Sequence, residues 1–220
     1  MLRSMKKLLL AFALLFVCLS LPTPAFAEEP APPTASPVHF STKDKKDLVR
    51  IETYLNNLKN VSADFMQIDD AGGIMRGQLA IARPGKMRVT YAEPSKDFII
   101  ADGSYVHIWN EDLQSQTNVD QSTSLAEFIL RDPVKLEGDV TITKLARFQS
   151  KIEVTLVQTN DPGAGSLTLV FEDKPLKLRQ WKVIDPQGRS TGVSLENLSD
   201  HAKFPDSLFV FTPPNFGKND

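Results

Sequence analysis

Arg83 stands at the end of an apolar strand face. Its guanidinium stays charged and presents five N–H donors in a rigid fork. Alternation in GQLAIARPGKMRVTY (77–91) predicts two strands joined by a Pro-Gly turn. Their same-side residues are Leu79, Ile81 and Arg83 in one strand, and Met87, Val89 and Tyr91 in the other. Spacing alone leaves two interpretations: a surface arginine that pairs with an acid, or one with a defined hydrogen-bonding role.

The other ionisable side chains form no catalytic or metal-binding pattern. His39, His107 and His201 are far apart and lack metal-ligand spacing. Asp69–Asp70 and Glu111–Asp112 flank expected turns, where acidic residues are common. The sequence has no dinucleotide-binding glycine motif, P-loop or nucleophile-elbow serine. We therefore expect no enzyme activity, cofactor or metal, with a secreted hydrolase that uses a carboxylate pair as an alternative.

Residues 1–27 are typical of a secretory signal peptide. A basic start precedes an apolar run at 8–21 and an Ala-x-Ala end, so we expect cleavage after Ala27 and export. Cys18 lies in the apolar run, where the bulky Val17 precedes it. We interpret this cysteine as a hydrophobic residue rather than a lipid-attachment site.

Removing residues 1–27 changes the charge and the redox chemistry. The whole chain has 25 basic and 27 acidic residues; the segment holds three basic and no acidic ones, which leaves 22 against 27, a net charge of −5. This acidity argues against nucleic acid and anionic membranes as partners. The remaining chain has no cysteine and must be stabilised by its core. We expect a Pro/Ala-rich, poorly ordered lead-in at 28–40 and one domain at 41–220.

Two helices are predicted. Residues 41–60 combine capping-box spacing at Ser41 and Asp44 with an apolar stripe of helical period, formed by Leu48, Ile51, Leu55 and Leu58. Residues 121–133 contain a short helix that Pro133 ends, and one side of it carries Leu125, Phe128 and Ile129.

The rest of the domain reads as strands separated by turns, which indicates a mainly β fold with one antiparallel sheet of about ten or eleven strands. The expected strands are 61–69, 77–83, 86–93, 97–103, 104–110, 139–148, 151–159, 165–173, 176–185, 190–198 and 208–213. A sheet this large curls strongly or closes partly. Pattern alone leaves open whether its inner face is filled by its own side chains or encloses a lipid-sized cavity.

The order of several segments resembles the periplasmic outer-membrane lipoprotein carrier family, the LolA type, from about residue 41 to 217. The matching segments are VSADFMQ, GQLAIARPGKMRVTY, DFIIADGSYVHIWN, SLAEFILRDP and FVFTPP. The resemblance implies a strongly curved, half-open antiparallel sheet, an incomplete barrel, with an N-terminal helix and short lid helices over an apolar cavity. It also implies a monomeric periplasmic carrier. Such a carrier receives acylated lipoproteins from an inner-membrane ATP-driven exporter and delivers them to the outer membrane or to an acceptor lipoprotein there.

The resemblance also implies roles for single residues. Arg83 falls on the family's strand-end arginine, which bonds backbone oxygens of the lid and holds the empty cavity shut. The acyl-chain cavity would be lined by Phe65 near its floor and by Leu79, Ile81, Met87, Val89, Tyr91, Ile100, Val106, Ile108, Leu125, Phe128 and Ile129. Strand parity leaves Ile99 and Ile100 as alternatives, because one residue of slip exchanges the faces.

A second function fits the same implied fold. Periplasmic stress sensors use a bent sheet of this kind as a lipid-sensing or regulatory binding module. Those proteins usually carry a second domain, for which we expect no room in this chain.

Overall fold

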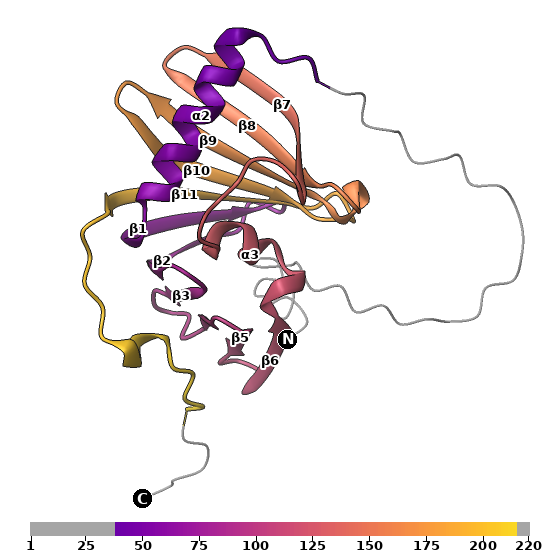
Figure 1. Cartoon of the computed structure of the whole chain (residues 1–220). Coiled ribbons are helices and arrows are strands. Elements are labelled where there is room, and N and C mark those ends of the chain that lie inside the picture. Colours follow the sequence, from indigo (N-terminus) through magenta and orange to yellow (C-terminus); the bar gives the residue numbers. More distant parts are fainter. Residues whose placement is uncertain (1–37, 215–220) are drawn as a thin grey trace, which may run out of the picture.

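The structure, a computed structural model, describes residues 38–214 (Figure 1). The expected signal peptide, Cys18 and the lead-in up to residue 37 lie outside the described residues. Within 38–214, no helix combines the length and the hydropathy that crossing a membrane requires.

Eleven strands form a single antiparallel sheet in the order β6-β5-β4-β3-β2-β1-β11-β10-β9-β8-β7. The strands are β1 (Asn60–Asp69), β2 (Ile74–Ala82), β3 (Lys86–Tyr91), β4 (Phe98–Asp102), β5 (Tyr105–Asn110), β6 (Ser115–Asp120), β7 (Val140–Phe148), β8 (Lys151–Gln158), β9 (Ser166–Asp173), β10 (Leu176–Ile184) and β11 (Ser190–Ser199). Two meanders, β1–β6 and β7–β11, meet where β1 pairs with β11. Because β6 and β7 are the two edges, the sheet curves without closing into a barrel (Figure 1).

Extra residues in β10 and β11 bend the sheet and re-aim side chains. In β10 the register shifts at Arg179, so Leu178 and Trp181, three residues apart, share the inner face. In β11 the shift falls at Asn197, whose φ of 50° is left-handed, and it turns Leu198 inward beside Leu195. β-Bulges of this kind increase local twist and bend the strand.

Helix α2 (Thr42–Asn57) lies across the inner face of the β7–β11 half (Figure 1). The predicted capping box is present: the Ser41 N–H donates to the Asp44 carboxylate at 2.8 Å, and the Asp44 N–H donates to the Ser41 hydroxyl at 3.2 Å. Hydrogen bonds from Ser41, followed by Arg147 of β7, lower the pKa of Asp44 to about 2. Arg147 also donates to Asp47 at 2.6 and 2.8 Å, which ties the start of α2 to the edge strand.

The connection between β6 and β7 crosses the open side of the sheet. It holds a 3₁₀ turn (Gln121–Thr123), helix α3 (Leu125–Leu130) and a loop. We call residues 121–136 the lid. The predicted short helix is therefore confirmed, shorter than its expected range. Buried side chains of the inner face, α2 and the lid form one continuous apolar core.

Two strand predictions differ from the structure. Residues 208–213 were expected to form a strand, but Asp206–Phe209 makes a 3₁₀ turn and the following residues are irregular. This segment packs on the outer face of β3–β5, where Phe211 stacks on His107 with ring centroids 4.9 Å apart. Strand β6, in contrast, was not predicted, because its sequence SQTNVD has no apolar alternation to reveal it.

Candidate functional site

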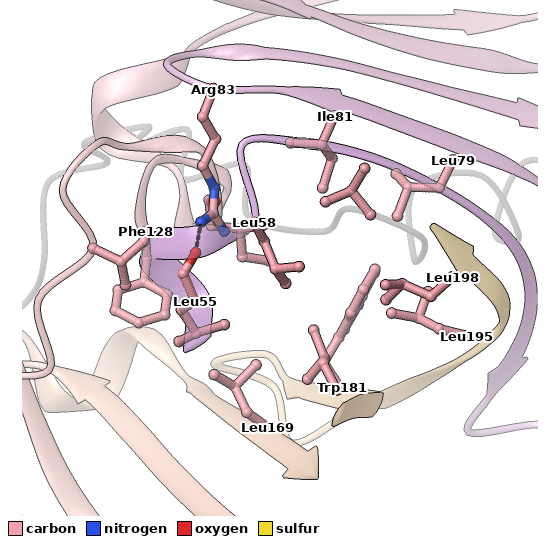
Figure 2. Close-up of a pocket in the computed structure, with 14 residues that line it drawn as sticks. Leu55, Leu58, Leu79, Ile81, Arg83, Phe128, Leu169, Trp181, Leu195 and Leu198 are labelled. Atoms are coloured by element: carbon pink, nitrogen blue, oxygen red, sulfur yellow. Dashed lines mark hydrogen bonds between the residues drawn. The ribbon is translucent and has the colours of Figure 1, made fainter. Parts of the chain in front are cut away.

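An apolar pocket lies between the lid, the C-terminal end of α2 and the inner face of the sheet (Figure 2). The space inside it that a water-sized sphere can occupy is only about 30 Å³, far below the volume of a small-molecule site, so its own side chains nearly fill it. The pocket is lined by Leu55, Leu58, Val61, Leu79, Ile81, Arg83, Phe128, Ile129, Val134, Leu169, Leu178, Trp181, Leu195 and Leu198. Apart from Arg83, every lining side chain is aliphatic or aromatic, so the pocket suits a hydrocarbon ligand.

Arg83 spans one end of this pocket from the β2–β3 turn (Figure 2). Its Nε donates to the Ile129 carbonyl of α3 at 2.7 Å, and its Nη1 donates to the Leu55 carbonyl of α2. Figure 2 shows the side chain reaching the end of α2, away from Leu195 and Leu198. Burial lowers the pKa of the guanidinium to about 10, opposed by the nearby charge of Asp132, so Arg83 remains a cation at neutral pH. One charged side chain thus fastens both helices over the sheet.

A second set of contacts anchors the C-terminal part of the lid to α2. The Asn56 amide donates to the Val134 carbonyl at 2.9 Å and accepts from the Val134 N–H at 2.8 Å. Lys59 pairs with Asp132 at 2.6 Å. At the end of α3, the Gly85 N–H of the β2–β3 turn donates to the Leu130 carbonyl at 2.9 Å. The lid is therefore held by its neighbours from residue 129 to residue 134.

Comparison with known proteins identifies the family to which the chain belongs. The family model described as outer membrane lipoprotein carrier protein LolA matches residues 56–212, more than half of the chain. The chain belongs to the LolA family. A curated outer-membrane lipoprotein carrier protein from Alkalilimnicola ehrlichii is 30% identical over 225 residues, which cover 94% of this chain and 93% of that protein.

Two further similarities have a lower sequence identity. An uncharacterized protein from Rickettsia prowazekii is 25% identical over 167 residues, which cover 76% of this chain and 77% of that protein. The crystal structure of a LolA superfamily protein from Nitrosomonas europaea aligns with a TM-score of 0.42 at 9% identity, and covers 74% of this chain and 97% of that one. At that score the alignment supports no conclusion about function.

Most residues predicted for the LolA-type cavity lie on the inner face, in two groups. Leu79, Ile81, Phe128 and Ile129 line the pocket together with Arg83. The second group is buried on the same inner face beyond the pocket: Phe65, Met87, Val89, Tyr91, Val106 and Ile108. The side chain of Leu125 lies outside the described part of the lid. Side chains thus fill most of the inner face in this closed state, and a small pocket of about 30 Å³ remains under the lid.

The placement of Ile100 was wrong. It pairs with Arg88 and His107, whereas Ile99 pairs with Val89 and Ile108 of the inner set. Ile100 therefore points to the outer face, where it is only 1% exposed. It belongs to an outer layer that the C-terminal segment covers, so its hydrophobicity does not report on the cavity.

Sequence reasoning missed the pocket wall contributed by the β9–β11 half and by the end of α2. The missed residues are Leu55, Leu58, Val61, Val134, Leu169, Leu178, Trp181, Leu195 and Leu198. Leu55 and Leu58 were visible in the helical stripe of α2. The alternation of apolar residues could not place Trp181 and Leu198 on the inner face. A bulge in each strand shifts which residues point to which face.

The described residues contain no cluster of histidine, cysteine, aspartate or glutamate that could hold a metal ion. The site as a whole offers burial and a latch of hydrogen bonds. Such an arrangement supports reversible enclosure of an apolar group.

Proposed function

We propose that this protein is a periplasmic carrier that shields the acyl chains of lipoproteins between the inner and outer membranes. The observation that supports it most directly is the apolar pocket closed by a charged side chain that donates to backbone carbonyls of the two covering helices. Membership of a family of lipoprotein carriers supplies the cargo class.

The energetics favour a pocket that is adaptable rather than tightly complementary. Each buried methylene contributes about 0.8 kcal/mol, so several long chains represent tens of kcal/mol in gross terms. A carrier that captured this fully could not release its cargo. The walls are mostly aliphatic, and about 30 Å³ of free space is too little for even one acyl chain, so loading requires the lid to move.

The closed state also protects the empty protein. An open inner face would expose an apolar patch larger than a soluble monomer usually carries, with a tendency to aggregate. Hydrogen bonds from a charged donor are strong enough to bias a two-state lid towards closure and weak enough for acyl-chain burial to overcome.

In this scheme the partners are an inner-membrane ATP-driven exporter that loads the carrier, and the outer membrane or an acceptor lipoprotein that unloads it. The protein works as a monomer without a cofactor. Its export depends on residues 1–27 acting as a cleaved signal peptide.

The test is to isolate the protein from periplasm and identify co-purifying molecules by mass spectrometry. Acylated lipoproteins are the expected result. Free phospholipid or a membrane-anchored regulator would instead support the lipid-sensing module, and no apolar ligand at all would refute the carrier. A photo-crosslinker at Leu79 of the inner face should trap lipoprotein, whereas Thr90 of the outer face serves as the matched control. Equal trapping at both positions would contradict the assignment of the pocket.

A further inference from the structure

An aromatic pair lies beside the part of the pocket that is farthest from Arg83 (Figure 2). On β1 the inner-face residues run Val61, Ala63, Phe65, and Val61 lines the pocket whereas Phe65 does not. Phe65 lies in register with Leu195 of β11, which lines the pocket. The four residue steps from Val61 to Phe65 span about 13 Å of strand. Along β1 the pocket therefore ends before Phe65.

Tyr91 of β3 completes this layer. Its ring meets the Phe65 ring edge to face, with centroids 5.5 Å apart and planes at 84°. The two strands are not neighbours, since β2 runs between them and presents Gly77 at the same level. A Cβ on Gly77 would lie 2.8 Å from Phe65 ring atoms. The glycine therefore lets two aromatic rings meet across an intervening strand and close the inner face.

A polar bond locks the pair in place. The Tyr91 hydroxyl donates to the Gln67 Oε1 at 3.1 Å, and the two residues are 4% and 3% exposed. Burial raises the pKa of Tyr91, so the hydroxyl stays a neutral donor. A hydrocarbon chain pushed past the rings would separate two buried polar groups with nothing to replace their bond. Passage is opposed both by the rings and by this loss.

We propose that Phe65 and Tyr91, locked by Gln67, form an end stop that sets the length of acyl chain the pocket accepts. The inference rests on the proposed carrier function and deepens it, because it gives the pocket a preferred length of saturated acyl chain. Methylenes on the pocket side of the stop gain burial, and those beyond it gain none. Affinity should therefore rise with chain length and then level off.

The experiment measures the affinity of saturated fatty acids, from octanoic to eicosanoic acid, by competition with a fluorescent fatty acid. In the wild type each methylene should tighten binding by about fourfold until affinity levels off at one length. Tyr91→Leu, which shortens the stop and removes its hydroxyl, should move the levelling point to longer chains. Leu195→Phe, which places a larger side chain in the pocket wall beside Phe65, should move it to shorter chains. Ile100→Leu on the outer face is the matched control and should leave it unchanged.

The outcomes separate the two proposals. Acyl-chain binding with the same levelling point in the wild type, Tyr91→Leu and Leu195→Phe would overturn the end stop and leave the carrier standing. Failure of the folded wild type to bind any fatty acid or lipoprotein would overturn both. If Tyr91→Leu does not fold, Leu195→Phe decides alone, since it leaves the Phe65–Tyr91 contact intact.

Discussion

Replacing Arg83 by leucine should release the lid without disturbing the sheet. The substitution removes the donors to Ile129 of α3 and Leu55 of α2 and leaves an apolar side chain in an apolar pocket. Two backbone carbonyls lose their charged partner when the lid is closed and can reach water when it is open. The change therefore acts on the equilibrium between the two states.

The size of the effect follows from two opposing contributions. Hydrogen bonds to a charged group are worth about 1.5–3 kcal/mol each, or about 3–6 kcal/mol for the pair. The burial that lowers the pKa of Arg83 to about 10 shows that the buried cation loses hydration, which offsets part of this gain. We take a net contribution of about 1–3 kcal/mol, so the ratio of closed to open lid should fall roughly 5- to 150-fold.

Hydrogen–deuterium exchange of residues 125–136 is the direct assay, combined with binding of an environment-sensitive dye to exposed apolar surface. Arg83→Leu should speed exchange in the lid and increase dye binding. Arg88→Leu is the matched control, because Arg88 also donates to a backbone carbonyl, that of Leu208, at 3.3 Å on the outer face. Wild-type exchange in the lid of Arg83→Leu, together with wild-type loading and release of lipoprotein, would refute the latch.

Three other substitutions test the frame around the pocket. Gly77→Ala should lower the free energy of unfolding by more than about 2 kcal/mol in urea titrations, because its Cβ would lie 2.1 Å from a carbonyl oxygen of β3; Gly163→Ala, with room for a Cβ, should change it little, and equal effects would contradict the packing. The carboxyl of Asp44 has a pKa of about 2, below its ordinary 3.8, so its contribution to stability is complete above pH of about 4 and is lost as pH falls towards about 2. Asp44→Asn should therefore flatten the pH dependence of unfolding in that window, and an unchanged slope would count against the capping contact. Asn56→Ala should speed amide exchange across residues 131–136 by roughly 5- to 100-fold, since two hydrogen bonds to the lid are lost; unaltered protection there would show that Asn56 does not anchor it.

Most of the fold could be predicted from the sequence, because the patterns that mark its helices and strands are local. The capping box of Ser41 and Asp44 marked the start of α2, and strict alternation from Leu79 to Tyr91 placed those residues on the inner face. The pairing of β1 with β11 could not be predicted, because it joins strands about 130 residues apart and no local sequence pattern indicates it. Strand β6 was missed because an exposed polar edge needs no apolar face.

The site was predicted only in part, because alternation does not always show which face of a strand a residue occupies. Alternation fails wherever both faces of a strand are covered: Ile99 and Ile100 are equally buried, and only the register shows which one faces inward. It fails again at bulges, where Trp181 and Leu198 turn towards the pocket. The position of Arg83 could be marked from the sequence, but its carbonyl partners depend on how two helices lie over the sheet.

The lid is a continuous stretch of backbone whose ends are the two free edges of the sheet, β6 and β7. Because both ends of the lid lead into edge strands, we expect outward movement of the lid to change the separation of the two edges while the strand pairing stays intact. Access to the pocket and the curvature of the sheet are then coupled, and a bulkier cargo would be accommodated by a flatter sheet.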